Sequence, residues 1–139
     1  MFLSNRNNFK CWELKTNVIL YIMNFINRAS TDVIQEYIIS GKYLGGEGQT
    51  AEQCWESLEI YGMEKPDKEK FIKNVNERNV YYQMKELRRK RDELLKECDY
   101  IMISDYPNPH KDAWIKYRQE LRDLPTTADL TNVEYPSKP

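Results

Sequence analysis

The residues of this 139-residue chain that could carry chemistry are few and far apart. His110 is the single histidine, and it lies beside Pro109 and Lys111 in the first turn of an expected helix, where side chains are usually exposed. Hydrolytic catalysis needs a nucleophile, a base and an orienting group that converge in space, and no such set is visible. The carboxylates are interleaved with basic residues, as on solvated helix faces. We therefore expect no catalytic residue and no enzyme activity.

Metal and cofactor sites have no better support. Cys11, Cys54 and Cys98 are widely spaced and odd in number, which favours free thiols in a reducing compartment over a disulfide framework. No CxxC pair accompanies the lone histidine, so we expect no metal site. We expect the glycines within 45–48 to form a flexible joint. They do not predict a phosphate-binding loop, because the lysine and the hydroxyl residue of that motif are missing. We expect no cofactor.

A cluster of cations is the one charge feature that looks functional. Residues 64–98 are net basic, although the chain as a whole carries a charge of -1. Such a cluster can contact phosphates or an acidic partner surface. The cations are distributed around the helix rather than along one stripe, which disfavours nucleic acid binding. The cluster comprises Lys85, Arg88, Arg89, Lys90 and Arg91.

The elements that position these residues are mainly helical. Residues 67–98 contain neither proline nor glycine, which predicts one long helix. Apolar residues follow a heptad spacing over 80–101, with Arg91 as a charged interruption. We expect this seam to pack within the chain, and homo-oligomerisation through it is the alternative. The seam consists of Val80, Met84, Leu87, Arg91, Leu94, Cys98 and Ile101.

A shorter helix is predicted over 109–124. Asn108 is a suitable N-cap, Pro109 fits the first helical position, and Pro125 should end the helix. One apolar face of this helix should pack against the long helix, so that the two form an antiparallel hairpin. The facing sets are Trp114, Tyr117, Leu121 and Leu124 on the shorter helix and Leu87, Leu94, Leu95 and Cys98 on the longer one.

The chain divides, by this interpretation, into an N-terminal module of unknown type (1–63) and the hairpin with an extended tail (64–139). The apolar run 18–26 is either a buried strand or a short buried helix, and its β-branched and aromatic content favours the strand. Nine residues are too few to cross a bilayer, which takes about 20. No cleavage pattern of a signal peptide follows. We expect no membrane contact.

Two short helices are predicted in the N-terminal module. The sequence Ser-Thr-Asp at 30–32 should cap a helix that ends at Gly41. Thr50 and Gln53 have the spacing of a capping box, and Gly62 is placed to end the helix that follows. Beyond the hairpin, the last residues form either a frayed tail or a strap.

Three segments of the C-terminal half resemble the phage tail assembly chaperone family in order and spacing. RDELL at 91–95, followed by Asp99 and Tyr100, is similar to RDxLLxxxDW. AWIKYRQELRDLP at 113–125 keeps every fixed position of AWxxYRQxLRDLP, and VEYPSKP at 133–139 is similar to VxWPxxP. Tyrosine replaces tryptophan at positions 100 and 135, which keeps an aromatic anchor with less area to bury. The resemblance leaves about the first 80 residues uncovered.

The resemblance implies a phage-encoded, non-enzymatic protein that contacts a tail or tail-fibre protein in the host cytoplasm during assembly. The alternative is a stoichiometric virion component that stays in the tail, and a helical nucleic-acid-binding protein is a third, weaker interpretation. Trp114, Tyr117, Leu121 and Tyr135 are the expected anchors, either in the core or against a partner. Arg118 and Arg122 are the candidate polar contacts, and Val133 with Tyr135 would anchor the strap.

Overall fold

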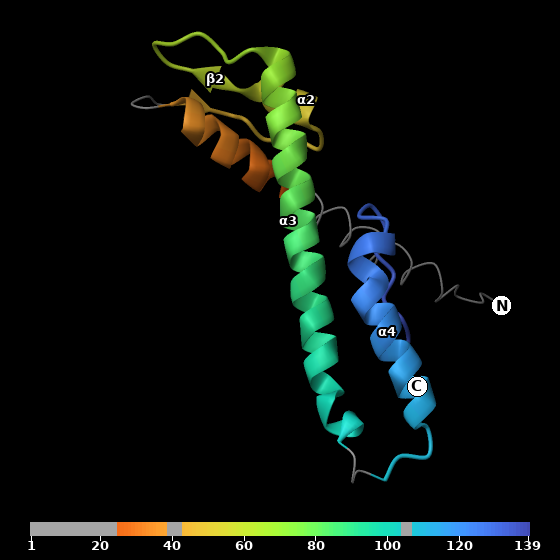
Figure 1. Ribbon diagram of the computed structural model, residues 1–139. Helices are drawn as coiled ribbons and strands as arrows, with labels where there is room; N and C mark the ends of the chain where they lie inside the picture. The colour runs from red at the N-terminus through yellow and green to blue at the C-terminus, as the bar shows by residue number, and fades with distance from the viewer. Residues whose placement is uncertain (1–24, 39–42, 104–106) are drawn as a thin grey trace, which may run out of the picture. The chain divides into compact units, whose positions relative to one another are not determined.

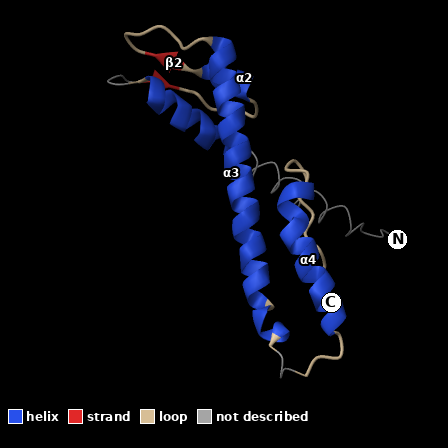
Figure 2. Cartoon of the chain, in the orientation of Figure 1, coloured by secondary structure: helices blue, strands red, loops and turns tan. Residues whose placement is uncertain are grey.

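A computed structural model describes residues 25–38, 43–103 and 107–139 of the chain (Figure 1). The described residues are mainly helical and include one small antiparallel sheet of two strands, which confirms the predicted fold class (Figure 2). The chain forms two compact units, Met1–Asn79 and Val80–Pro139, and the division falls inside helix α3 (Lys68–Glu97).

Residues 25–37 of the first unit are helical, so Ser30 and Thr31 lie inside a helix and do not cap one. Their hydroxyls are satisfied in another way. Thr31 Oγ1 donates to the carbonyl of Asn27 (2.9 Å), and Ser30 Oγ donates to the carbonyl of Gly46 (2.6 Å). The strand interpretation of 18–26 is wrong for its last two residues, which are helical. The rest of that segment and Gly41 lie outside the described residues.

Helix α2 (Ala51–Ser57) begins as predicted, because Thr50 Oγ1 accepts a hydrogen bond from the amide of Gln53 (3.2 Å). The second arm of the capping box differs, since Gln53 Oε1 accepts from the amide of Gln49 (2.8 Å). The predicted end at Gly62 is wrong. Backbone at Leu58 is extended, and β2 (Glu59–Ile60) follows and pairs with β1 (Tyr43–Leu44).

The glycine-containing loop 45–48 is fitted against its surroundings, contrary to the expected flexible joint. Gly45 has φ +76°, and a Cβ there would lie 1.9 Å from the carbonyl oxygen of Ser57, so only glycine allows this approach. Gly46 N donates to Ser57 Oγ (3.1 Å), and Gly48 N donates to Asn27 Oδ1 (2.9 Å). Side chains on both sides therefore satisfy the loop backbone.

Helix α3 confirms the prediction of a long helix to within one residue at each end. Asp67 precedes it, and Asp67 Oδ1 accepts a hydrogen bond from the amide of Lys70 (2.9 Å), which is the geometry of an N-cap. In the first unit α3 contributes Phe71 and Val75, both fully buried. After Glu97 the chain makes a short 3-10 helix, η1 (Asp99–Met102).

Helix α4 (Lys111–Thr127) lies beside α3 in the second unit and completes the predicted hairpin (Figure 1). The predicted bounds 109–124 are wrong at both ends. Asn108 Oδ1 accepts from the amide of His110 (2.9 Å), so Asn108 forms a turn before the helix instead of its cap. Pro125 lies inside the last turn. It is accommodated there because Ala128 N still bonds to Leu124 O (2.9 Å) and both threonines that follow Pro125 bond to Asp123 O.

Candidate interaction surface

The hairpin of the second unit has a small core built from both helices. Cys98, Ile101, Tyr117 and Leu121 are fully buried, and Leu94, Leu95, Trp114 and Tyr135 pack against them. The predicted packing of the α4 aromatic face against the C-terminal half of the seam is therefore confirmed. The rings of Trp114 and Tyr117 meet edge to face with centroids 5.7 Å apart, a favourable arrangement for aromatic pairs.

Arg118 lies inside the hairpin, where its side chain joins the two helices. It is 9% exposed, and its Nη1 donates to the carbonyl of Leu95 (2.9 Å) and lies 3.0 Å from Cys98 Sγ. Its Nη2 forms an ion pair with Asp99 Oδ1 (2.7 Å). Burial alone would lower the pKa of Arg118, but the bonds to Asp99 and Cys98 raise it, so the guanidinium stays charged. Arg118 thus supplies a positive donor to the carbonyl end of α3.

The last seven residues, 133–139, have no regular secondary structure and lie against the hairpin, and we call them the strap. Tyr135 is half-buried on the hairpin core, and Val133 is half-buried as well. Lys138 Nζ pairs with Glu97 Oε2 at 2.5 Å. Burial raises the pKa of the Tyr135 hydroxyl. Of the two alternatives for the tail, this arrangement matches the anchored strap.

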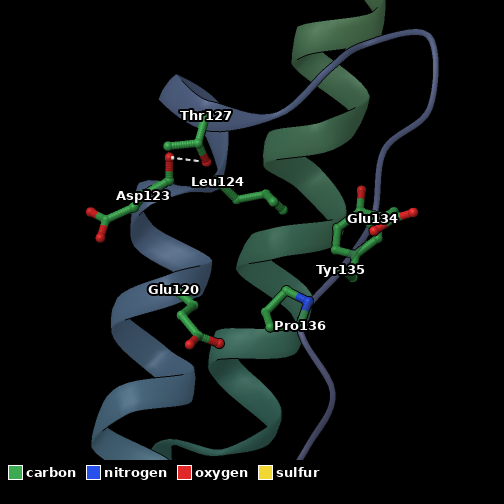
Figure 3. Close-up of a pocket in the computed structure, with 7 residues that line it drawn as sticks. All are labelled: Glu120, Asp123, Leu124, Thr127, Glu134, Tyr135 and Pro136. Atoms are coloured by element: carbon green, nitrogen blue, oxygen red, sulfur yellow. Dashed lines mark hydrogen bonds between the residues drawn. The ribbon is translucent and has the colours of Figure 1, made fainter.

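Tyr135 lines two open hollows. The first, of about 420 Å³, lies between α4 and the strap, and Figure 3 shows Glu120 directed toward Pro136 while the Asp123 carboxylate turns away from the strap. The second, of about 260 Å³, lies between α3 and Tyr135. The first is lined by Glu120, Asp123, Leu124, Thr127, Glu134, Tyr135 and Pro136, and the second by Lys90, Glu93, Leu94, Glu97 and Tyr135.

The basic cluster of α3 is partly neutralised by its own helix. Arg89 pairs with Glu86 and with Glu93, and Arg91 pairs with Asp92 at 2.8 Å. These hydrogen bonds raise the pKa of Arg89. Two members, Lys85 and Arg88, are exposed and have no ion pair within the described part of the chain, and Lys90 lines the second hollow.

The remaining candidate residues are on the surface. Arg122 and His110 are exposed, and Trp114 is half-buried. Across residues 25–38, 43–103 and 107–139, no group of three or more histidine, cysteine, aspartate or glutamate side chains is arranged to hold a metal ion. None of the helices in these ranges is long and apolar enough to span a membrane.

The aromatic residues predicted as anchors lie in or against the hairpin core, whereas the inward position of Arg118 was not predicted from the sequence. The spacing of Arg118 from its apolar neighbours could have indicated this position. Arg118 follows Trp114 by four residues and precedes Leu121 by three, so all three share a helix face. The two hollows beside Tyr135 had no sequence signal, because they depend on how the strap returns to the hairpin.

Comparison with models of protein families gives a match between residues 84–139 and the family described as phage tail assembly chaperone protein. The match begins in the second half of α3 and includes α4 and the strap, so it contains all three motifs on which the resemblance rested. The predicted resemblance of the C-terminal half is therefore confirmed. Neither the curated proteins nor the solved structures gave a significant match to the chain.

Proposed function

We propose that this chain is a non-enzymatic assembly chaperone for a phage tail or tail-fibre protein and acts through protein-protein contacts. The observation that supports this most directly is that the family match covers the residues that build the hairpin and the strap. Such a protein would act on its client in the host cytoplasm, before the client joins the particle.

The second unit has surfaces suited to holding an apolar part of a client. Tyr100 and Ile103, near the turn of the hairpin, and Ile115 on α4 are exposed large hydrophobic side chains. A client that covered them would remove their apolar surface from water, which is favourable. Among the candidate anchors, we assign Tyr117, Leu121 and Arg118 to the framework that positions these surfaces. Trp114, Tyr135 and Arg122 remain candidates for direct contact with the client.

Co-expression tests the proposal. The tail-fibre and tail proteins of the same phage are produced singly with and without the chain, and the soluble yield of each is measured. We expect one of them to depend on the chain for solubility and to co-purify with it. The chaperone proposal fails if no tail or tail-fibre protein gains solubility or binds the chain.

A stoichiometric virion component is the second candidate function, and the separate first unit favours it. Residues 1–83 lie outside the family match, and Met1–Asn79 form a compact unit of their own. Such a unit could hold the tail while the hairpin holds a fibre. Mass spectrometry of purified virions beside infected-cell lysate separates the two functions. A chaperone is released from finished particles, whereas a component is retained in a fixed copy number.

Nucleic acid binding through α3 has less support than either function. Two of the five clustered arginines and lysines, Arg89 and Arg91, are already paired with carboxylates of the same helix. A DNA-binding surface would require affinity that falls steeply with salt and depends on Lys85 and Arg88. Homo-oligomerisation through the 80–101 seam remains a proposal, and the exposed Val80 is the seam residue most open to a second copy.

A further inference from the structure

Side-chain contacts attach the strap to the hairpin. Among the backbone–backbone hydrogen bonds of the described residues, none joins residues 133–139 to α3 or α4. Its principal contacts are the ring of Tyr135 on the core and the ion pair between Lys138 and Glu97. That pair is about half exposed on both sides, and exposed pairs contribute little. Detachment of the strap therefore exposes the half-buried Tyr135 and Val133 and breaks the pair between Lys138 and Glu97, but it breaks no backbone–backbone hydrogen bond to the helices.

The strap also leaves space unfilled beside it on the surface of α3 and α4 on which it lies, and we call this surface the groove. Tyr135 lines two open hollows, of about 420 Å³ and about 260 Å³. On the hairpin side, Leu124 gives the first hollow an apolar wall (Figure 3). Leu94 gives one to the second. A segment with a larger aromatic residue at the position of Tyr135 would bury more surface than the strap does.

We propose that this groove between α3 and α4 is the site for an extended segment of the client, and that the strap is an internal placeholder which the client displaces. The inference rests on the proposed chaperone function and names the chemistry of its partner. The occupant seen in the structure defines that chemistry: an aromatic residue followed by proline, with a basic residue shortly after.

Each part of this pattern has a physical reason in the groove. The aromatic ring packs against the core of Cys98, Ile101, Tyr117 and Leu121. Proline has no amide to leave unpaired, and it holds the segment extended before binding, which lowers the entropy lost on docking. A basic residue is favoured because carboxylates border both hollows. On the hairpin they belong to Glu93 and Glu97 on one side and to Glu120 on the other.

A client segment fits the groove better than the strap of a second copy. An exchanged strap carries the same side chains and would leave the same two hollows empty. A foreign segment can fill them, and it then binds more tightly than the strap it replaces. We expect the strap to occupy the groove first and the client to displace it, because the strap is tethered beside the groove at an effective concentration on the order of millimolar.

The test uses the full chain and a fluorescent peptide, TNVEYPSKP, which has the sequence of residues 131–139. In Tyr135→Ala the strap of the chain competes less, so we expect the peptide to bind this variant at least about tenfold more tightly than the wild type, given the apolar surface of one buried side chain. Ser137→Ala, on the exposed side of the strap, is the matched control and should bind as the wild type does. A peptide with tryptophan in place of tyrosine should bind more tightly, and one with alanine should not bind.

Circular dichroism and the melting temperature show whether Tyr135→Ala remains folded. Lys138→Glu gives a second measurement that leaves the core untouched, since Lys138 is exposed. It places like charges at Glu97 and should also increase peptide affinity over the wild type, by less than Tyr135→Ala does because the site is half exposed. If folded Tyr135→Ala and Lys138→Glu bind the peptide no better than the wild type, the placeholder inference is overturned.

Competition with the client separates this inference from the proposed function. Once a tail or tail-fibre protein is captured, excess tryptophan peptide should release it from the chain. Capture that the peptide leaves unchanged overturns the groove assignment while the chaperone function stands, whereas absence of any capture counts against the chaperone function itself. A concentration-dependent dimer that the peptide dissociates would assign the groove to a second copy and overturn the client assignment.

Discussion

Replacement of Arg118 by alanine tests the most specific contact of the hairpin. The guanidinium bonds to the carbonyl of Leu95 at 2.9 Å, touches Cys98 Sγ at 3.0 Å and pairs with Asp99 at 2.7 Å. In the variant the carbonyl of Leu95 loses its charged donor at the end of α3. The alanine also leaves a space between the helices where the guanidinium stem had packed.

The free-energy cost follows from these contacts. A hydrogen bond from a charged donor to a buried acceptor contributes about 1.5–3 kcal/mol. The ion pair to Asp99 adds at most about 1 kcal/mol, because the Asp99 side chain is 60% exposed and solvent screens the pair. We therefore expect Arg118→Ala to lower the free energy of unfolding of the second unit by about 2–4 kcal/mol.

Urea unfolding followed by far-UV circular dichroism measures the loss, and hydrogen exchange localises it to the end of α3. Arg122→Ala is the matched control, since Arg122 lies one turn further along α4 and is exposed. Its effect should stay within about 0.5 kcal/mol, as for most surface changes. If the two variants unfold at the same urea concentration, the inward arginine does not stabilise the hairpin and the reasoning is refuted.

Three further outcomes are expected. Leu121→Ala should destabilise the second unit by about 2–5 kcal/mol in urea unfolding, because Leu121 is fully buried, while the half-exposed Ile115→Ala on the same helix should cost much less. Tyr135→Trp should raise the melting temperature, since a larger ring fills the hollows beside the strap; an unchanged or lower value would show that they do not admit it. Burial raises the pKa values of Tyr117 and Tyr135 above the ordinary 10.0, so the unfolded chain loses these protons at a lower pH than the folded chain does. The free energy of unfolding should therefore fall as the pH rises above about 10. The melting temperature measured against pH, with Tyr135→Phe for comparison, checks this.

The hairpin could be predicted from the sequence because its signals are local and repeated. Uninterrupted helix formers predicted α3, and the heptad spacing identified the face that α4 covers. The bounds of α4 were predicted less accurately. Pro125 normally ends a helix, but here it falls where only two helical residues follow and their hydroxyls bond to Asp123 O.

The first unit could not be predicted in the same way, because distant contacts override its local signals. Serine is a favoured N-cap residue, yet the Ser30 hydroxyl donates to the carbonyl of Gly46, sixteen residues away. The end of α2 at Ser57 depends on the approach of Gly45 to the helix, which no nearby residue indicates. In the candidate site, Tyr135 was found as an anchor from its type and family motif, but the space around it depends on tertiary packing.

The unlike surroundings of two glycines show where the first unit can accept foreign sequence. Gly46 faces Ile34 Cδ1, which would lie 2.5 Å from an added Cβ, and its amide and carbonyl are both hydrogen-bonded to other segments. Gly62 shares the positive φ but has open space around it. A fluorophore tag or an affinity epitope inserted directly after Gly62 would thus leave the fold undisturbed, whereas the same graft at Gly46 would separate the helix at 25–37 from α2.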